Sequence, residues 1–156
     1  MIEIFTDGSA KGNPGPGGYG IVMRLNQHYK ELSQGYRLTT NNRMELLAVI
    51  VALRSLKTKK HKIRVTTDSK YVVDAVNKGW LWNWQKTGFK KKKNVDLWQA
   101  FIPLYNAYKP TLSWIKGHAG HPENERCDEL AVKSAESSSL LVDEGYENDP
   151  NQSLPL

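Results

Sequence analysis

The chain opens with a short run of alternating apolar and polar residues that ends on a carboxylate. A glycine-rich segment, whose backbone can adopt many conformations, follows it. Residues 2–7, IEIFTD, place Ile2, Ile4 and Thr6 on one face and so predict a strand that closes on Asp7. The next thirteen residues contain six glycines and two prolines. Sites in open α/β sheets form beyond the carboxyl ends of strands. We therefore expect the chain to build a site where this first strand ends.

The pattern after the glycines predicts a layered α/β domain with a mixed sheet. Alternating runs at residues 19–25 and 31–38 favour an antiparallel meander with the first strand. Helical and strand-like segments then alternate, which is typical of an α/β fold. The expected later elements are a helix within 39–57 capped by Asn41 or Asn42, a strand within 62–69, a helix at 70–77, a helix from 94 that Pro103 interrupts, a strand at 111–117 and a helix from Pro122.

Positive charge is concentrated in the first three quarters of the chain. Residues 1–120 carry 20 Lys and Arg against 7 Asp and Glu, whereas residues 121–156 carry 2 against 9. A basic body favours a polyanionic partner, nucleic acid before an anionic membrane, although solubility alone would also explain the charge. Residues 137–156 hold serines and acids with few large apolar groups, which predicts a flexible acidic tail behind a domain at 1–136.

Length and cysteine content narrow the expected location. A chain of 156 residues suits one domain with a sizeable core. No apolar run reaches the length of a membrane span, and the first residues lack the layout of a signal peptide. The lone Cys127 excludes an internal disulfide and fits a reducing compartment. We expect a cytoplasmic protein without a membrane partner, and a monomer because no interface signature is visible.

Four acidic residues occupy positions where carboxylates can meet. Asp7 and Asp68 each close a predicted strand after a threonine, and they lie side by side if those strands are neighbours. Glu45 and Asp128 head apolar helical stripes, where an acid is costly unless it is paired or binds a cation. Singly, each is explained as a turn residue or as a group favoured by the helix dipole. Together they predict a site for Mg²⁺ or Mn²⁺, two of which can hold a phosphodiester for attack by water.

Two further segments carry residues suited to nucleic-acid chemistry. Residues 78–93 combine three tryptophans, one phenylalanine and six lysines. Rings that stack on sugars or bases beside amines that meet phosphates favour nucleic-acid binding, whereas rings in the core and a solvated lysine loop are the alternative. The loop KGHAGH places His118 before the last helix, where a histidine can carry protons near a metal-bound water.

Five ordered motifs resemble those of bacterial ribonuclease HI, the type 1 ribonuclease H family, over about residues 2–136. They are FTDGS…GNPGPGGYG, TTNNRMEL, TDS.YV, KNVDLW and KGHAGHPENERCDELA. The resemblance implies a ribonuclease H-like α/β fold, in which three antiparallel strands plus two parallel ones form a five-stranded mixed sheet flanked by helices. It makes residues 1–136 the catalytic domain. It also implies two-metal-ion hydrolysis of the RNA strand of RNA/DNA hybrids, leaving 5′-phosphate and 3′-hydroxyl ends, with Mg²⁺ as cofactor and Mn²⁺ as a substitute.

The resemblance assigns roles to particular residues. Asp7, Glu45, Asp68 and Asp128 match the metal-binding carboxylates. His118 matches a loop histidine linked to proton transfer or product release. The matching substrate contacts are Gly8, Ser9, Ala10, Asn13, Asn41 and Asn42 at the minor groove of the hybrid, Lys70 where a glutamine is usual, Thr40 and Asn94 at a DNA phosphate, and Trp80 and Trp84 on a basic protrusion that holds the DNA strand.

The sequence departs from the family pattern near Trp80, and two other function classes remain as alternatives to a ribonuclease. Trp82 is an additional aromatic, and the spacing on both sides of Trp80 differs from the family pattern. A non-catalytic hybrid- or duplex-binding module is one alternative, but it would not need four buried carboxylates. A related nuclease or integrase that acts on DNA is the other. Asparagines beside the carboxylates favour reading of 2′-hydroxyl groups instead.

Overall fold

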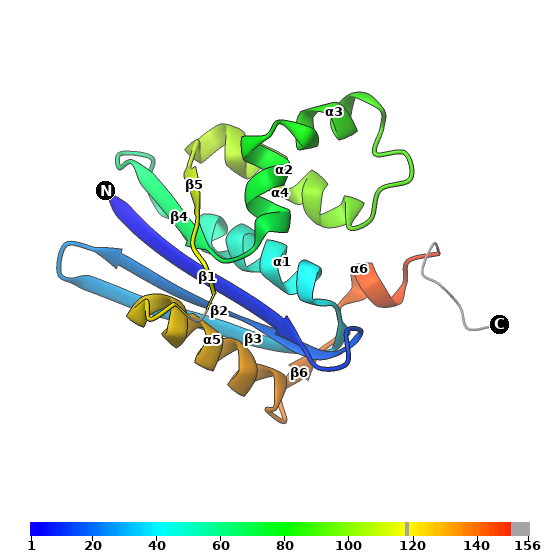
Figure 1. Ribbon diagram of the computed structural model, residues 1–156, viewed down its shortest axis with the longest axis horizontal. Coiled ribbons are helices and arrows are strands. Elements are labelled where there is room, and N and C mark those ends of the chain that lie inside the picture. Colours follow the sequence, from blue (N-terminus) through cyan, green and yellow to red (C-terminus); the bar gives the residue numbers. More distant parts are fainter. Residues whose placement is uncertain (118, 151–156) are drawn as a thin grey trace.

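A mixed six-stranded sheet forms the centre of the computed structural model, which describes residues 1–117 and 119–150. Its strands lie in the order β5-β4-β1-β2-β3-β6 (Figure 1). The first three form an antiparallel meander, whereas β4 and β5 run parallel to β1, and β6 runs parallel to β3. The bounds are β1 (Ile2–Ala10), β2 (Gly15–Leu25), β3 (His28–Thr39), β4 (Ile63–Thr67), β5 (Thr111–Trp114) and β6 (Leu140–Leu141).

Helices cover both faces of the sheet. Figure 1 shows α5 on one face of the meander and α1, with α4 beyond it, on the other. No helix in the described ranges is long and apolar enough to cross a membrane. The bounds are α1 (Asn41–Arg54), α2 (Lys70–Asn77), α3 (Trp80–Lys86), α4 (Val95–Tyr108), α5 (Pro122–Ala135) and α6 (Glu144–Glu147).

The two faces of β2 explain why α5 and α1 pack differently. Tyr19, Ile21 and Met23 belong to the apolar core shared with α1. Gly18 and Gly20 alternate with them, and a Cβ on Gly20 would overlap the carbonyl oxygen of Cys127 in α5. The glycine-rich segment therefore lets a helix lie directly on the strand backbone.

The mixed α/β architecture is confirmed, but the sheet has six strands rather than the expected five. The sixth strand arises because Gly35 and Tyr36, on the edge strand β3, pair with Leu140 and Leu141. An unpaired sheet edge leaves backbone groups without partners, and this short pairing covers part of it. Two residues are too few to show strand alternation, so the sequence pattern gave no sign of them.

The helical layer also differs from expectation in three places. Thr40, rather than an asparagine, caps α1, because its side chain accepts a hydrogen bond from the Arg43 backbone N–H. The helix α3 follows a glycine cap without a side-chain hydrogen bond and was not predicted. The helix α4 continues through Pro103, with Phe101 buried before the proline and Tyr105 packed on the core after it. Packing on both sides offsets the missing hydrogen bond.

Residues 137–150 are not the flexible tail that their composition predicted. They contain β6 and α6, and Asp143 is buried at 7% exposure. Arg37 forms a two-pronged ion pair with Glu147. The expectation fails because partners from β3 and α1 fix acidic residues that looked solvated. Residues 151–156 lie outside the described part of the chain.

Candidate active site

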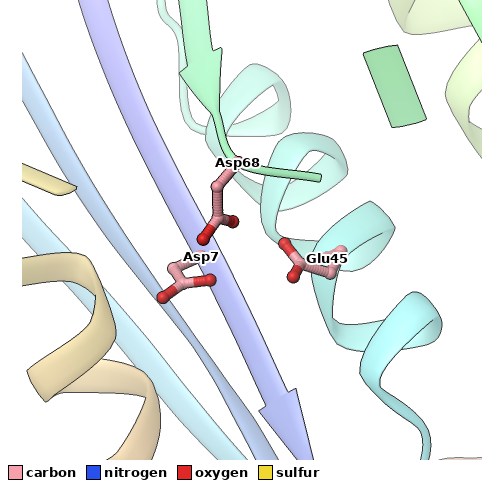
Figure 2. Close-up of side chains that lie close together, drawn as sticks. All are labelled: Asp7, Glu45 and Asp68. Atoms are coloured by element: carbon pink, nitrogen blue, oxygen red, sulfur yellow. The ribbon is translucent and has the colours of Figure 1, made fainter. Parts of the chain in front are cut away.

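Three of the four predicted carboxylates meet at one edge of the sheet. Asp7 belongs to β1, Asp68 follows β4 directly, and the pairing of Thr6 with Thr67 in the parallel ladder sets the two aspartates side by side. Glu45 reaches them from one turn inside α1, as Figure 2 shows. One oxygen from each carboxylate lies within 4.8 Å of the others. The expectation that Asp7 and Asp68 lie side by side is met, although β1 continues to Ala10 and does not close on Asp7; only its pairing with β4 ends there.

A backbone contact brings α1 close enough for Glu45 to join the aspartates. A Cβ on Gly8 would overlap the backbone of Met44 and Glu45. The glycine after Asp7 thus lets β1 and α1 touch without an intervening side chain. The Gly8 N–H also donates a 2.9 Å hydrogen bond to Oδ1 of Asp7, which orients that carboxylate.

Burial and mutual repulsion raise the proton affinity of this cluster. Burial raises the pKa of Asp7 to about 8, and the charge of Asp68 adds to the increase. The pKa of Glu45 lies well above its ordinary value, because the group is buried and faces the charges of Asp7 and Asp68. Without a cation, protons must neutralise part of the cluster near neutral pH.

The donor set fits a divalent cation with oxygen ligands. Three carboxylates converge without a thiolate or imidazole among the grouped ligands. Oε2 of Glu45 is buried and has no hydrogen-bond partner within residues 1–117 and 119–150. A buried carboxylate oxygen without a donor is costly, and a cation would compensate for that cost. The residues present therefore fit Mg²⁺ or Mn²⁺.

Asp128 lies beside the cluster rather than within it. It is half-buried on α5, and both its charge and a side-chain hydrogen bond contribute to the raised pKa of Asp7. The close group of three does not include it. His118 lies outside the described residues. Its neighbour Gly117 lies against Asp68, because a Cβ there would come within 2.6 Å of Oδ2.

Predicted groove-contact residues gather where β1 leaves the cluster. Gly8, Ser9 and Ala10 form the last part of β1. The Asn41 side chain accepts a hydrogen bond from the Ala10 N–H, and the Asn41 N–H donates to Oδ1 of Asn13 at 3.0 Å. These bonds hold two asparagines beside the strand that carries Asp7. The remaining member, Asn42, is exposed in the first turn of α1.

Arg43, which was not singled out from the sequence, contacts both members of the predicted phosphate-binding pair, Thr40 and Asn94. The Arg43 backbone N–H bonds to Thr40, and its guanidinium lies 3.4 Å from Oδ1 of Asn94. Arg43 is 3% exposed and forms ion pairs with Asp96 at 2.7 Å and Asp143 at 2.8 Å. Burial would lower the pKa of Arg43, but hydrogen bonds to both carboxylates raise it above its ordinary value. Thr40 and Asn94 are therefore both held by contacts with Arg43.

The basic aromatic segment lies on and after α3, at the outer edge of the helical layer (Figure 1). Trp80 is 43% exposed, with the Lys78 amine 5.3 Å from its ring centroid. Trp84 is half-buried and packs edge-on against Trp98, with Lys92 at 5.0 Å from its ring. The core alternative therefore holds in part for Trp84, which packs against Trp98, whereas Trp80 is exposed at the surface and its contact with nucleic acid stays a prediction.

Two other residues near the site were not singled out from sequence. The Tyr71 hydroxyl accepts hydrogen bonds from Asn94 at 3.0 Å and from the Trp98 indole at 2.9 Å. Trp114 ends β5, and its indole N–H donates to the carbonyl oxygen of Asp68 at 3.0 Å. Lys70, one of the predicted contacts, lies over the Trp114 ring. The available signal for Trp114 was a large aromatic two residues before the KGHAGH loop.

Comparisons with known proteins agree with this geometry. The family model for RNase H matches residues 1–136. Ribonuclease H of Klebsiella pneumoniae is 57% identical over 152 residues, covering 94% of this chain and 96% of the relative. Ribonuclease H of Psychromonas ingrahamii is 54% identical over 151 residues, covering 94% and 97%.

Solved structures give the same result. LC9-RNase H1, described as a type 1 RNase H with the type 2 active-site motif, superposes with a TM-score of 0.77 at 34% identity and covers 94% of this chain and 79% of its own. LC11-RNase H1, solved in complex with RNA/DNA hybrid, gives 0.61 at 28% identity and covers 87% and 97%. The matched sequence spans β1 to α5, which includes every element that carries the carboxylates. The chain belongs to the ribonuclease H family.

Proposed function

We propose that Asp7, Glu45 and Asp68, with Asp128 beside them, form the centre with which this ribonuclease H hydrolyses the RNA strand of RNA/DNA hybrids. The observation that carries the proposal is the convergence of three carboxylate oxygens within 4.8 Å. Such a cluster gains little from protein partners alone, because like charges repel. It suits an enzyme that works with bound cations better than it suits a passive binding module.

The chain's own groups prepare the site for a phosphodiester. Bound Mg²⁺ ions, or Mn²⁺ in their place, would polarise the phosphate and supply a nucleophilic water at neutral pH. Asp7 is held in position by the Gly8 N–H, and Glu45 by the contact between β1 and α1. Asp128 faces Asp7 from α5, where its charge and a side-chain hydrogen bond help to raise the pKa of Asp7. His118 is proposed to carry a proton or to assist product release, because its neighbour Gly117 lies against Asp68. The products would carry 5′-phosphate and 3′-hydroxyl ends.

Substrate choice is assigned to three groups of residues. Gly8, Ser9 and Ala10, with the asparagines Asn13, Asn41 and Asn42, would read the minor groove, where 2′-hydroxyl groups distinguish RNA from DNA. Thr40 and Asn94 would hold a DNA phosphate. The exposed Trp80 ring and the neighbouring lysines would contact the DNA strand, with Trp84 anchoring them to the core.

The setting of the reaction is also proposed. We place the catalytic domain at residues 1–136, with residues 137–150 as an ordered extension. We propose that the enzyme acts as a monomer in the cytoplasm. The +6 net charge supports an attraction to nucleic acid.

One substrate panel tests the proposal. An end-labelled sequence is supplied as RNA/DNA hybrid, RNA duplex, DNA duplex and single-stranded RNA, each with Mg²⁺, Mn²⁺ or chelator. We expect metal-dependent cutting of the RNA strand of the hybrid alone. Cutting of the DNA duplex would move the activity to related DNA nucleases. Binding of the hybrid without cutting would mean that the carboxylates are idle.

A matched pair of variants tests the site itself. Asp7→Asn should abolish cleavage while largely retaining hybrid binding, because one ligand charge is lost and the shape is kept. Asp74→Asn removes an aspartate of α2 that pairs with Lys78 at 3.7 Å, and it should leave cleavage unchanged. Normal cleavage by Asp7→Asn would refute the site assignment.

A further inference from the structure

Trp114 is a large exposed side chain that lies against the backbone of Asp68, a member of the carboxylate cluster. Its exposed fraction is 43%, although it ends a strand of the central sheet. The ladder pairs Trp114 with Thr67, the last residue of β4, so the backbone at Trp114 lies beside Asp68, which follows β4 directly. The 3.0 Å hydrogen bond from the indole N–H to the Asp68 carbonyl oxygen fixes the orientation of the ring. The ring therefore has a defined position but remains open to solvent.

Lys70 occupies the open surface of this ring. Its amine lies 4.8 Å from the Trp114 ring centroid, which is within the range of a cation–π contact. Lys70 is also the first residue of α2, where the helix dipole disfavours a positive charge. Stability of α2 thus does not explain a lysine at this position. The contact with Trp114 is the feature that does account for the location of the amine.

The ring limits the positions that the lysine can adopt. A lysine side chain is flexible and strongly hydrated when it is free. Contact with a fixed aromatic face reduces that freedom before a ligand arrives, which lowers the ordering cost of binding. Lys70 follows Asp68 by two residues, and the ring that it contacts is hydrogen-bonded to the Asp68 backbone, so the amine is tied to the segment that carries this carboxylate.

We propose that Trp114 is a positioning residue that holds the Lys70 ammonium group for a phosphate of the nucleic-acid strand lying over the carboxylates. The proposal rests on the proposed function of that cluster. It adds one ionic contact to hybrid binding and makes the contact depend on an aromatic side chain of β5. It also gives the lysine, at a position where the family usually has a glutamine, a phosphate to bind.

The test is hybrid binding by the Asp7→Asn protein as a function of salt. Adding Lys70→Gln should weaken binding about 3–10-fold at 0.1 M salt and reduce the slope of log K against log salt by about one, because one phosphate contact is lost. Trp114→Leu should produce part of both effects. The double variant should bind no more weakly than Lys70→Gln alone. Lys59→Gln, in an exposed lysine-rich loop, is the matched control and should leave the slope unchanged.

The outcomes separate this proposal from its alternatives. An unchanged salt slope for Lys70→Gln, or additive losses for the two positions, would overturn it. Trp114→Phe keeps an aromatic face and should retain more of the slope than Trp114→Leu; equal losses in two folded variants would also overturn it. Circular dichroism melts identify any variant that fails to fold. Failure of the unmodified enzyme to bind or cut the hybrid would instead refute the proposed function, and that is measured first.

Discussion

Replacing Asp143 by Asn tests whether the C-terminal segment stabilises the domain. The Asp143 carboxylate accepts hydrogen bonds from Arg43 at 2.8 and 3.0 Å and from the Thr39 hydroxyl at 2.7 Å. It also caps α6 by accepting from the Tyr146 N–H. Asparagine keeps the shape and a capping oxygen but removes the charge. The substitution therefore isolates the ion pair with Arg43.

The size of the effect follows from burial. Arg43 is 3% exposed and its Asp143 partner 8%, measured on the side chains, so water cannot replace the lost carboxylate. Breaking a fully buried pair costs about 3–5 kcal/mol of unfolding free energy. Asp96 remains as a partner for Arg43, but it is 46% exposed. We therefore expect a loss of about 3 kcal/mol, which corresponds to about 6–12 °C in Tm for a chain of this size.

Thermal unfolding followed by circular dichroism provides the measurement. Glu147→Gln is the matched control, because its Arg37 partner is 61% exposed, so water can solvate the guanidinium and the loss should be small. Truncation after Ser138 removes Asp143 and α6, so it should destabilise at least as much as Asp143→Asn, whereas a flexible tail would be dispensable. If Asp143→Asn melts with the unmodified protein, the ion pair does not stabilise the fold and this reasoning is refuted.

Three further predictions concern the cluster and the packing of α5. In chelator, the free energy of unfolding should fall as pH rises from 3.8 to about 8, since Asp7 holds a proton in the folded state that the unfolded chain has released; Tm against pH tests this, and Asp7→Asn should flatten the curve. Added Mg²⁺ should raise Tm more at pH 8 than at pH 5, because protons compete with the cation; equal increases would contradict carboxylate ligation. Gly20→Ala should cost about 1–3 kcal/mol in a denaturant titration, because its Cβ overlaps α5; an unchanged midpoint would show that the helix can move away.

Features encoded in short stretches of sequence could be predicted. Strand alternation located β1, and the expected pairing of the two strands brought Asp7 and Asp68 side by side, although β1 continues past Asp7 to Ala10. The apolar stripe of α1 predicted that Glu45 faces inward. Each of these inferences depends on spacing within one element and on the general geometry of sheets.

Features that join distant segments could not be predicted in the same way. Arg43 and Asp143 are 100 residues apart, and nothing in the local pattern of either residue names the other. Acidic composition suggested a solvated tail, but a buried guanidinium changes what a carboxylate contributes. From the sequence, the glycine-rich run after Asp7 indicated only a permissive backbone, whereas the structure shows that Gly20 makes room for α5. The sequence shows the chemical type of each residue, but which residue it contacts is decided by the fold.

The direct contact of β1 with α1 at Gly8 acts as a rigid spacer between Asp7 and Glu45, the carboxylates that the strand and the helix contribute to the site. The separation of Asp7 and Glu45 is set by main chain against main chain, so it does not depend on the sizes of core side chains. Core substitutions that alter stability should therefore leave the size of the cation site unchanged. A designer could vary the interior for heat resistance and keep metal selectivity, provided that this one position carries no side chain.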